Sequence, residues 1–550
     1  MKVVIPSAKI VPRELQNLGR LPAIIYPVGQ GIVFDYLLEQ YEEQADSVRI
    51  MCYEMADEVK RGLSSYRSEK IHIQRLDRLG DLGDTVYAGL EDTHTSVVIN
   101  FADTIVLDRF PEKCRDGFFY SEDYPSDIWT FFDCEDGVIT SVRDKQKGAD
   151  ARKREKLFVG VFCLSDEGDF KECLKEAGSA DNGQISGFYQ ALTLYSRKHP
   201  MEAVRTENWF DIGHADKYYN SKLEVKAREF NHITIDKNRG ILRKSSDDRE
   251  KFIGEILWYL KLPADIEYVR PRIFSYSTDY SGPYVTMEYY SYHTVHELFL
   301  YGDLSYHQWR DIFSRIRFIY DDFKRYQVSG GGIRPALQEV YLDKTCKRLD
   351  RLRRDSRFAL FFEKKMRING VSYVPLDIIC QRLSQEIPAR LYDVDTFHII
   401  HGDLCFANIM VDSNFSFIKV IDPRGKFGSY DIYGDQRYEL AKLFHSVDGK
   451  YDFIIKDLFR IDTDKDKARI DFQILDRHRE FDLYEAFLEV FRDEIGENKA
   501  DIELIEALLF LSMIPLHGES AEHQYAMLAT GIQILDRVMD IRAEQERREG

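Results

Sequence analysis

The sequence has few cysteines and no long hydrophobic run, and both shortages narrow the class of protein. Its eight cysteines are scattered through 550 residues, and no two of them form a CxxC pair. Disulfide frameworks and structural zinc sites need closely spaced cysteines, so we expect neither, and a reducing cytoplasm fits best. No window is long and apolar enough to cross a bilayer, and the first residues lack the basic, apolar, small-residue order of a signal peptide.

An excess of positive charge is also missing, because the formal net charge is −18 at pH 7. Proteins that bind nucleic acid neutralise its phosphates with lysine and arginine, so general binding of polyanions is not expected. The length predicts two or three domains, and the apolar content suffices for large cores. We expect a small-molecule substrate, no nucleic acid and no membrane insertion; a homo-oligomer is left open.

Patterns of strand and helix alternate over the first hundred residues. Apolar runs predict strands at 2–6, 47–53, 71–75 and 95–101, and helical spacing predicts helices at 32–43 and 55–65 and one that opens at Gly83. This alternation predicts an α/β domain whose mostly parallel sheet has helices on both faces. Ligands collect at the carboxyl ends of such strands, and Asp103 follows one of them.

From residue 117 the pattern becomes antiparallel. Strands at 128–134 and 138–143 flank the turn Glu135-Asp136-Gly137, and the charged stretch 144–156 is typical of a solvated loop. A strand at 157–164 and helices at 187–197 and 215–226 complete this domain.

The pattern changes again after Arg228. A hairpin over 230–243, a helix over 247–260 and strands at 272–276 and 284–289 predict a small sheet lobe with one helix. Beyond Thr294 the pattern predicts helices only, apart from the stretch 397–435. We therefore expect two domains, 1–228 and 229–550, the second an α+β domain with a small lobe at 229–293 and a helical lobe at 294–550.

The stretch 397–435 places polar residues at the ends of apolar runs. Asp403 follows the first run, Asn408 lies five residues later, and Asp422 ends the second run. Phosphoryl transfer uses such a set: one carboxylate orients a hydroxyl nucleophile, while an amide and a second carboxylate hold Mg²⁺ against nucleotide phosphates. The alternative is a simple turn with solvated acids, and the combined spacing of the three residues argues against it.

The motifs HGDLCFAN at 401–408, IDPRG at 421–425 and GDQRYELAKLFHSVDGKYDF at 434–453 resemble the aminoglycoside phosphotransferase and choline kinase family. The resemblance implies a protein-kinase-like fold in which Asp403 is the catalytic base. It further implies that Asn408 and Asp422 carry Mg²⁺ and that His401 supports the catalytic loop.

The same resemblance implies an ATP-binding lysine on a strand of the small lobe and a glutamate on its helix. Lys244 is the expected lysine and Glu255 its expected partner, with Glu250 as the other candidate. The segment Met287-Glu288-Tyr289 is expected to be the hinge whose backbone meets adenine. No GxGxxG motif precedes Lys244, as is usual in this family.

Residues 1 to about 225 resemble sugar-phosphate and phosphocholine nucleotidyltransferases. The matching segments are VVIPSA in the first strand, LPAIIYPVGQGIVFDYLLEQY at 21–41, GDTVYAGL at 83–90, NFADTIV at 100–106, FVGVF at 158–162 and WFDIGHADKYYNSK at 209–222. The resemblance implies that Asp103 and Asp211 together bind Mg²⁺, which stabilises an attacking phosphate and a pyrophosphate leaving group. It also implies nucleotide contacts from two segments: Ser7, Ala8, Lys9 and Arg13, and Gly83, Asp84 and Thr85.

The first segment departs from that family. Lys9 stands where the family has the first glycine of a phosphate-binding loop, and Ala23 stands in place of its catalytic lysine. Lys9, Arg13 and Arg20 could supply positive charge instead.

The leading hypothesis is a bifunctional cytoplasmic enzyme that phosphorylates a small alcohol, amino alcohol or sugar with ATP. It would then transfer a nucleotidyl group, with CTP favoured by the resemblance, and give an activated donor for capsule or other surface-polysaccharide decoration. Two alternatives are open. The first is a kinase with a regulatory N-terminal domain that binds nucleotide without catalysis, and Ala23 favours it. The second is a scaffold that is inactive in both halves, and Asp403, Asn408 and Asp422 argue against it.

Overall fold

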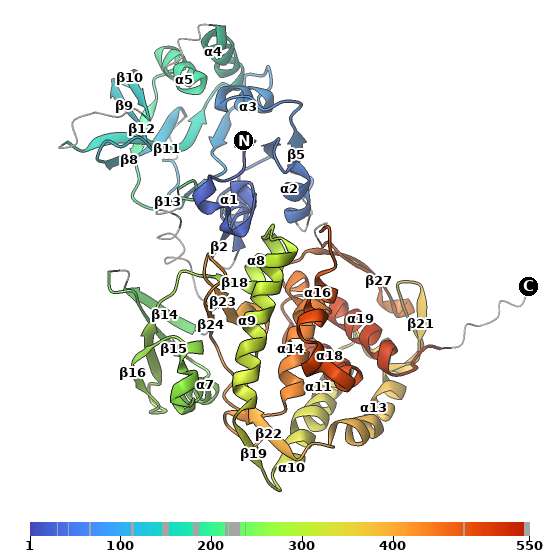
Figure 1. Cartoon of the computed structure of the whole chain (residues 1–550). Helices are drawn as coiled ribbons and strands as arrows, with labels where there is room; N and C mark the ends of the chain where they lie inside the picture. Colours follow the sequence, from blue (N-terminus) through green and yellow to red (C-terminus); the bar gives the residue numbers. More distant parts are fainter. Residues whose placement is uncertain are drawn as a thin grey trace, which may run out of the picture. The chain divides into compact units, whose positions relative to one another are not determined.

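The computed structural model divides into two compact units, unit 1 (residues 1–226) and unit 2 (residues 227–550), and each is described by itself (Figure 1). The structure describes residues 1–29, 31–41, 43–64, 66, 68–111, 115–145, 153–179, 186–214, 218, 231–236, 238–476 and 479–543. The expected domain boundary, most of the expected loop at 144–156 and, apart from Tyr218, the helix expected at 215–226 lie outside these residues.

Unit 1 is built around one nine-stranded sheet. Its main path runs β10-β9-β11-β6-β1-β4-β5, while β8 pairs with β11 and β12 pairs with β8. The strands are β1 (Lys2–Ser7), β4 (Ser47–Cys52), β5 (Ile71–Arg75), β6 (Val97–Asn100), β8 (Gly117–Asp123), β9 (Thr130–Glu135), β10 (Val138–Asp144), β11 (Glu155–Leu164) and β12 (Glu202–Arg205). Outside it lie η1 (Arg13–Leu18), η2 (Ala23–Ile25), β2 (Pro27–Val28), β3 (Gly31–Ile32), β7 (Thr104–Val106) and β13 (Trp209–Asp211).

The sheet is mixed, and besides its parallel half β12 pairs parallel with β8. β6, β1, β4 and β5 are parallel neighbours, whereas β11 pairs antiparallel with β6, β8 and β9, and β10 pairs antiparallel with β9. The predicted α/β class and the predicted change to antiparallel strands are thus confirmed.

Helices cover both faces of this sheet. The helices are α1 (Val33–Tyr41), α2 (Ala56–Gly62), α3 (Leu82–Gly89), α4 (Glu167–Ser179) and α5 (Gly187–Lys198). α3, α4 and α5 lie together against one face, where their apolar residues pack with Val4 and Met51 (Figure 1). Val3 and Ile5 point to the other face and are also fully buried, and α1 is tied to the sheet by a 2.7 Å hydrogen bond from the Tyr41 hydroxyl to Asn100.

Unit 2 has a small lobe and a helical lobe, as expected for its α+β class. The small lobe is an antiparallel sheet in the order β14-β15-β17-β16 with one long helix. Its elements are β14 (Asn231–Asp236), β15 (Ile241–Ser246), α7 (Arg249–Lys261), η3 (Ala264–Val269), β16 (Ile273–Ser277) and β17 (Tyr284–Glu288).

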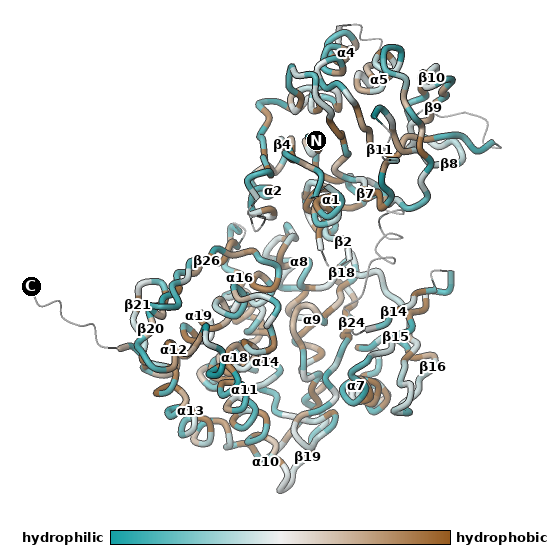
Figure 2. Tube along the Cα trace, turned by 180° about the vertical axis from the view of Figure 1, so that it is seen from behind, coloured by the Kyte–Doolittle hydropathy of each residue, from teal (hydrophilic) through white to brown (hydrophobic). Residues whose placement is uncertain are grey.

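The helical lobe packs long amphipathic and buried helices around the stretch 397–435. In Figure 2 the hydrophobic stretches of α9 and α14 lie inside this lobe. The helices are α8 (Val295–Tyr301), α9 (Tyr306–Lys324), α10 (Ile333–Leu337), η4 (Gln338–Asp343), α11 (Lys344–Arg353), α12 (Ala359–Glu363), α13 (Leu376–Leu391), η5 (Phe406–Asn408), α14 (Gln436–Val447), α15 (Tyr451–Ile454), η6 (Lys465–Lys467), α16 (Leu483–Val490), α17 (Arg492–Ile495), η7 (Gly496–Asn498), α18 (Lys499–Met513), η8 (Ile514–Leu516) and α19 (Ala521–Val538).

The expectation of helices alone outside that stretch was wrong. A second four-stranded sheet, β21-β20-β27-β26, combines two distant hairpins: β20 (Met366–Ile368) with β21 (Val371–Tyr373), and β26 (Phe459–Asp464) with β27 (Arg469–Ile474). These strands are short, and β20 pairs with β27 about a hundred residues away, so a local pattern does not identify the sheet. The remaining short strands are β18 (His293–Thr294), β19 (Gln327–Ser329), β22 (Thr396–Ile399), β23 (Ile409–Val411), β24 (Ile418–Val420) and β25 (Tyr433–Gly434).

Among the described residues, no helix combines the length and the apolarity that crossing a bilayer requires.

An aromatic cluster gives a direct test of the unit 1 core. Phe118 is fully buried, and its ring lies 4.9 Å from that of Phe132 and 5.0 Å from that of Phe158. We expect Phe118→Ala to lower the stability of unit 1 by about 3–5 kcal/mol, because it removes these contacts and leaves a cavity. Hydrogen exchange of β8 and β11 measures the loss. Leu107→Ala, at a residue of unit 1 that is 59% exposed, is the control and should cost less than about 0.5 kcal/mol.

Candidate active sites

A buried lysine joins the small lobe to the end of the second apolar run in unit 2. Lys244 Nζ on β15 lies 2.8 and 3.0 Å from the two carboxylate oxygens of Glu255 on α7, and 2.7 Å from Oδ1 of Asp422 after β24. Burial disfavours the ammonium charge, but the two carboxylates outweigh it and raise the pKa of Lys244. The lysine is therefore a fixed cation beside the half-exposed Asp422 carboxylate.

The structure distinguishes between the two candidate glutamates. Glu255 is 8% exposed and pairs with Lys244, whereas the Glu250 side chain is 84% exposed and lies 3.7 Å from Lys426. Five residues along a helix turn a side chain to a different face, so only one of the two can face β15. Burial, together with Asp422, raises the pKa of Glu255 to about 7, while the Lys244 ammonium acts in the opposite direction.

Asp403 faces a second buried lysine. Its Oδ1 lies 2.9 Å from Nζ of Lys442 on α14, and the Lys442 side chain is 8% exposed. Burial opposes ionisation of the aspartate, but Lys442, with Arg424, holds the pKa of Asp403 well below its usual range. Asp403 is thus a carboxylate at neutral pH, which suits it to accept a hydrogen bond from a hydroxyl and to orient it.

A buried glutamate that the sequence analysis missed holds the backbone beside Asp403. Glu439 on α14 accepts hydrogen bonds from the backbone N–H groups of His401 at 2.8 Å and Gly402 at 2.7 Å. Glu439 and Lys442 are three residues apart on one helix and so face the same side. Both lie in the quoted segment GDQRYELAKLF, and this spacing on a predicted helix was the available signal.

The donor set around Asn408 and Asp422 suits a hard cation. The Asn408 side-chain N–H donates to the Asp403 carbonyl oxygen at 2.9 Å, which leaves the amide oxygen for another partner. Asp422 has a left-handed backbone, with φ of 56°, and its N–H donates to the Tyr259 hydroxyl at 3.0 Å. A carboxylate and an amide oxygen held by such contacts are ligands that Mg²⁺ accepts beside phosphates.

Packing of the small lobe against the loop after β24 sets the position of Asp422. Gly425 has φ of 64°, and a Cβ there would collide with the carbonyl oxygen of Gly254 on α7. Glycine at this position therefore lets the loop approach α7 closely, one residue before Glu255.

His401, in the loop before Asp403, has a ring that is held by packing. Its side chain is fully buried, its two ring nitrogens have no hydrogen-bond partner among the described residues, and its ring lies 5.3 Å from that of Trp258. The Trp258 indole N–H in turn donates to the Ile400 carbonyl at 2.7 Å. Burial lowers the pKa of His401 to about 4.

The expected hinge needs correction. The backbone N–H groups of Glu288 and Tyr289 donate to the carbonyls of Arg272 and Gly240, both at 2.8 Å, and Met287 is paired within the sheet. These amides therefore serve the small sheet. A backbone N–H that donates to adenine would have to come from residues outside this segment.

In unit 1 two distant acidic residues meet where β7 pairs with β13. Asp211 lies opposite Thr104, and the Ile212 N–H donates to the Asp103 carbonyl at 2.7 Å. A Cβ on Gly213 would lie 2.8 Å from Asp103 Oδ2 and 3.1 Å from Asp211 Oδ1, so both carboxylates face this glycine. Burial and the Asp211 charge raise the pKa of Asp103 to about 6. Two carboxylates that repel each other in this way fit a divalent cation.

His214 completes this cluster and was missing from the expected site. Its Nδ1 lies 2.5 Å from Asp211 Oδ2, and its ring lies 5.4 Å from that of Trp129. The bond to Asp211 raises the pKa of His214 despite its partial burial.

The loop after β1 does not form the cradle of amides that the resemblance implies. The N–H groups of Ile10 and Val11 donate to Glu54 and to the Leu21 carbonyl, and the Ala8 carbonyl accepts from the Glu54 N–H. Ser7 and Ala8 are buried at the end of β1, whereas Lys9 and Arg13 are exposed. Ala23 is buried in η2, so no side chain replaces the family's lysine at that position.

The helix that contains Gly83–Thr85 begins one residue earlier than expected. α3 begins at Leu82 with Asp81 as its N-cap, and Asp84 completes a capping box with Asp81. Thr85 is buried and donates to the Asp81 carbonyl at 2.9 Å, and a Cβ on Gly83 would lie 3.2 Å from the Phe188 nitrogen on α5. These contacts account for the three residues without a nucleotide.

No protein-family model matches the sequence, and no match is found among curated proteins. Among solved structures the N-terminal part is similar to a nucleoside-diphosphate-sugar pyrophosphorylase from Vibrio cholerae RC9, at 14% identity and a TM-score of 0.33, covering 40% of this chain and 99% of that chain. It is also similar to the CTP:phosphocholine cytidylyltransferase of Streptococcus pneumoniae, at 13% identity and a TM-score of 0.34, covering 40% and 97%. A thermostable mutant of the aminoglycoside phosphotransferase APH(4)-Ia matches at 11% identity and a TM-score of 0.37, covering 57% and 94%. At these values the likeness assigns neither activity nor substrate to the chain.

The buried, neutral His401 predicts a pH dependence of the stability of unit 2. As the pH falls below about 6.5, the unfolded chain binds a proton that the folded state accepts only near pH 4, so stability is lost as the pH falls through this window. The contribution is roughly 3 kcal/mol across the full window.

Urea unfolding of the wild type and of His401→Phe measures this contribution of His401 to the stability of unit 2. The variant keeps an aromatic ring but cannot titrate. The wild type should lose more stability than the variant between about pH 7 and pH 4.5. Parallel losses in both proteins would show that His401 is not the group responsible.

Proposed function

We propose that unit 2 is an ATP-dependent kinase that phosphorylates a hydroxyl group of a small molecule. The observation that supports this proposal most is the geometry around Lys244, Asp422 and Asp403. Lys244 is a buried cation bonded to the exposed Asp422, and Asp403 is an ionised carboxylate paired with Lys442. Phosphoryl transfer needs little covalent chemistry from the protein and depends on positioning and charge, which this arrangement supplies.

Each residue has a defined task in this proposal. Asp403 accepts the hydrogen bond of the acceptor hydroxyl and aligns its oxygen with the γ-phosphorus of ATP, and Lys442 keeps that carboxylate ionised. Lys244 neutralises phosphate oxygens, held in place by Glu255. Asn408 and Asp422 would hold Mg²⁺, which when bound supplies charge neutralisation on the phosphates.

For unit 1 we propose nucleotidyl transfer at Asp103 and Asp211, which would hold a second Mg²⁺. A site of this kind would join the phosphate made by unit 2 to a nucleotide, with release of pyrophosphate. CTP is the favoured nucleotide by resemblance to phosphocholine nucleotidyltransferases, and the activated product would serve surface-polysaccharide decoration, such as capsule biosynthesis, from the cytoplasm. A bifunctional chain is chemically sensible because the product of the first step is the substrate of the second.

The second candidate is a kinase in which unit 1 is a regulatory domain that binds nucleotide without catalysis. It is favoured by buried Ala23 and by the amides of Ile10 and Val11, which are used within the protein rather than left for a triphosphate. Against it stands the pair Asp103 and Asp211, since mutual repulsion of a partly buried and a buried acid has no evident structural benefit.

Single substitutions in the full chain separate the two activities. With ATP, CTP, Mg²⁺ and a set of small alcohols, ADP and pyrophosphate are followed independently. Asp403→Asn should lower ADP formation by about 10²–10⁴-fold, because it removes the carboxylate that orients the nucleophile, yet leave pyrophosphate release from pre-phosphorylated substrate intact. Asp103→Ala should do the reverse.

Loss of both activities in either variant would refute two independent sites. ADP without pyrophosphate for an accepted substrate would instead select the regulatory role of unit 1.

A further inference from the structure

A cavity of about 1060 Å³ lies in the helical lobe beside the catalytic loop of unit 2. Its wall includes Gly402, directly before Asp403, and Arg424, two residues after Asp422. The other lining residues come from η4, α11, α14, the loop after β24 and the end of η8, and no described residue of the small lobe lines it. The volume suffices for a substrate the size of a sugar phosphate.

The lining is strongly basic, with seven lysine or arginine residues against three acidic ones. α11 supplies most of this charge, because its basic residues recur every three or four positions and so share one face. Its opposite face buries Thr345, Leu349 and Leu352 in the lobe. The basic residues on or directly after this helix are Lys344, Lys347, Arg348, Arg351 and Arg354.

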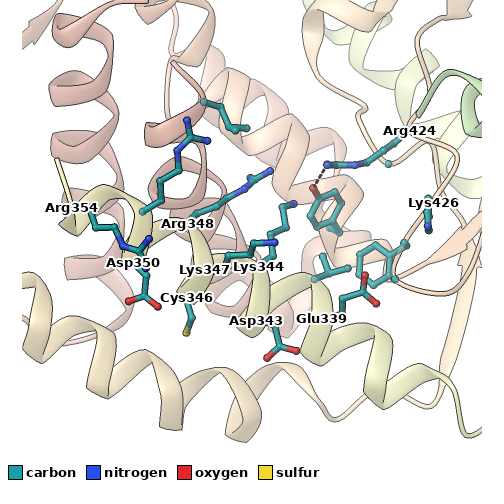
Figure 3. A pocket seen from close by; sticks show the side chains of 17 residues that line it. Glu339, Asp343, Lys344, Cys346, Lys347, Arg348, Asp350, Arg354, Arg424 and Lys426 are labelled. Atoms are coloured by element: carbon teal, nitrogen blue, oxygen red, sulfur yellow. Dashed lines mark hydrogen bonds between the residues drawn. The ribbon is translucent and has the colours of Figure 1, made fainter. Parts of the chain in front are cut away.

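Three of the cations are half-buried and point into the same space. In Figure 3 the side chains of Lys344 and Arg348 extend from α11 toward the side at which Arg424 enters. Arg424 lies 3.4 Å from the Tyr438 hydroxyl and Arg348 3.1 Å from the Ser512 carbonyl, both neutral partners. Among the described residues, none of these three cations forms an ion pair with an acid.

Mutual repulsion among these basic side chains agrees with their lack of ion pairs. Burial and the nearby Arg424 and Arg348 lower the pKa of Lys344 well below its usual range, and burial with Arg424 lowers that of Arg348. The three acidic residues of the lining, Glu339, Asp343 and Asp350, are all exposed to solvent. A cavity whose inner basic groups have no acidic partner within ion-pair distance among the described residues favours an anion and repels a cationic ligand.

We propose that this cavity binds the acceptor and that the acceptor carries an anionic group, a carboxylate or a phosphate, in addition to the hydroxyl that is phosphorylated. This inference rests on the proposed kinase function of unit 2 and narrows its substrate from alcohols, amino alcohols and sugars to anionic alcohols. The anionic group lies between Lys344, Arg348 and Arg424, and the hydroxyl faces Asp403. Guanidinium groups match the geometry of carboxylate and phosphate oxygens.

The triphosphate of ATP is a less suitable occupant of the same cations. Its expected partners are Lys244 and Asp422, which are bonded to each other. Lys244 belongs to the small lobe, and no described residue of that lobe lines the cavity. In the reaction the acceptor oxygen forms a bond to the γ-phosphorus as the bond from that phosphorus to the ADP oxygen breaks. The hydroxyl proton passes through Asp403 to solvent, and ADP leaves.

Binding of matched three-carbon probes to the full chain tests the charge preference without knowledge of the natural substrate. The probes are glycerol 3-phosphate, glycerate, neutral glycerol and cationic 3-amino-1,2-propanediol, titrated by calorimetry. We expect measurable binding of at least one anionic probe, at least about tenfold tighter than that of the neutral and cationic probes. Equal or tighter binding of the cationic probe, or no binding of either anionic probe, would overturn the proposal.

Substitutions locate the binding. Lys344→Gln combined with Arg348→Gln should weaken anion binding by at least about tenfold, since both lost charges face the cavity. Arg351→Glu with Arg354→Glu changes only exposed side chains, so the buried face of α11 is untouched, and this variant should weaken anion binding as well. Arg460→Gln, at an exposed arginine on β26 outside the cavity lining, is the matched control and should bind unchanged.

Unchanged anion binding in both cavity variants would place the site elsewhere and contradict the inference. Together with the activity of Asp403→Asn, the same probes also separate a failure of the anionic acceptor from a failure of the proposed kinase function. If Asp403→Asn forms ADP as fast as the wild type while anion binding depends on Lys344 and Arg348, the kinase assignment fails and the anion site stands. If ADP formation depends on Asp403 but the preferred acceptor is neutral or cationic, the kinase stands and the anionic acceptor fails.

Discussion

The bonds of Lys244 to Glu255 and Asp422 are the interaction on which the site in unit 2 depends. They join β15, α7 and the loop after β24 through one nearly buried cation. Removal of one partner of a buried ion pair typically costs about 3–5 kcal/mol, because the other charge stays in a poorly solvated place. The lysine therefore holds the small lobe against the loop that carries Asp422, and the same contact positions it for phosphate.

A second polar network makes the catalytic loop rigid from the other side. Glu439 binds the backbone of His401 and Gly402, and Lys442 binds the Asp403 side chain, so α14 fixes both the loop and its acid. Trp258 connects the two networks, because it lies on α7 and donates to the Ile400 carbonyl just before the loop. The reactive groups thus sit on a supported frame rather than on a free loop.

The sequence pointed to the residues to which we assign the chemistry better than to those that support them. Strand ends indicated Asp403, Asn408 and Asp422, the resemblance implied Lys244 and Glu255, and the fold class of both units followed from the order of strands and helices. Glu439 and Lys442 were missed because a charged residue on a helix is usually solvated, and only the packing of α14 shows that they are buried. The sheet formed by β20 and β27 and the cavity beside α11 depend on contacts between distant segments, which local pattern does not reveal. The N–H groups of Glu288 and Tyr289 in the expected hinge are used within the small sheet, and the pairing of these strands does not show in the local pattern.

In unit 1 the two acids, Asp103 and Asp211, meet as the resemblance implies, but the groups that support them do not follow the family. The loop after β1 and the position of Ala23 lack the family's phosphate-binding groups.

The central claim therefore rests on the kinase site of unit 2, and a crystal structure of the full chain with Mn²⁺ and a non-hydrolysable ATP analogue tests it most directly. The account predicts anomalous density for Mn²⁺ between the Asn408 side-chain oxygen and the Asp422 carboxylate, with Lys244 bonded to a phosphate oxygen and still paired with Glu255. Nucleotide bound without contact to Lys244, or Mn²⁺ bound away from Asn408 and Asp422, would contradict it.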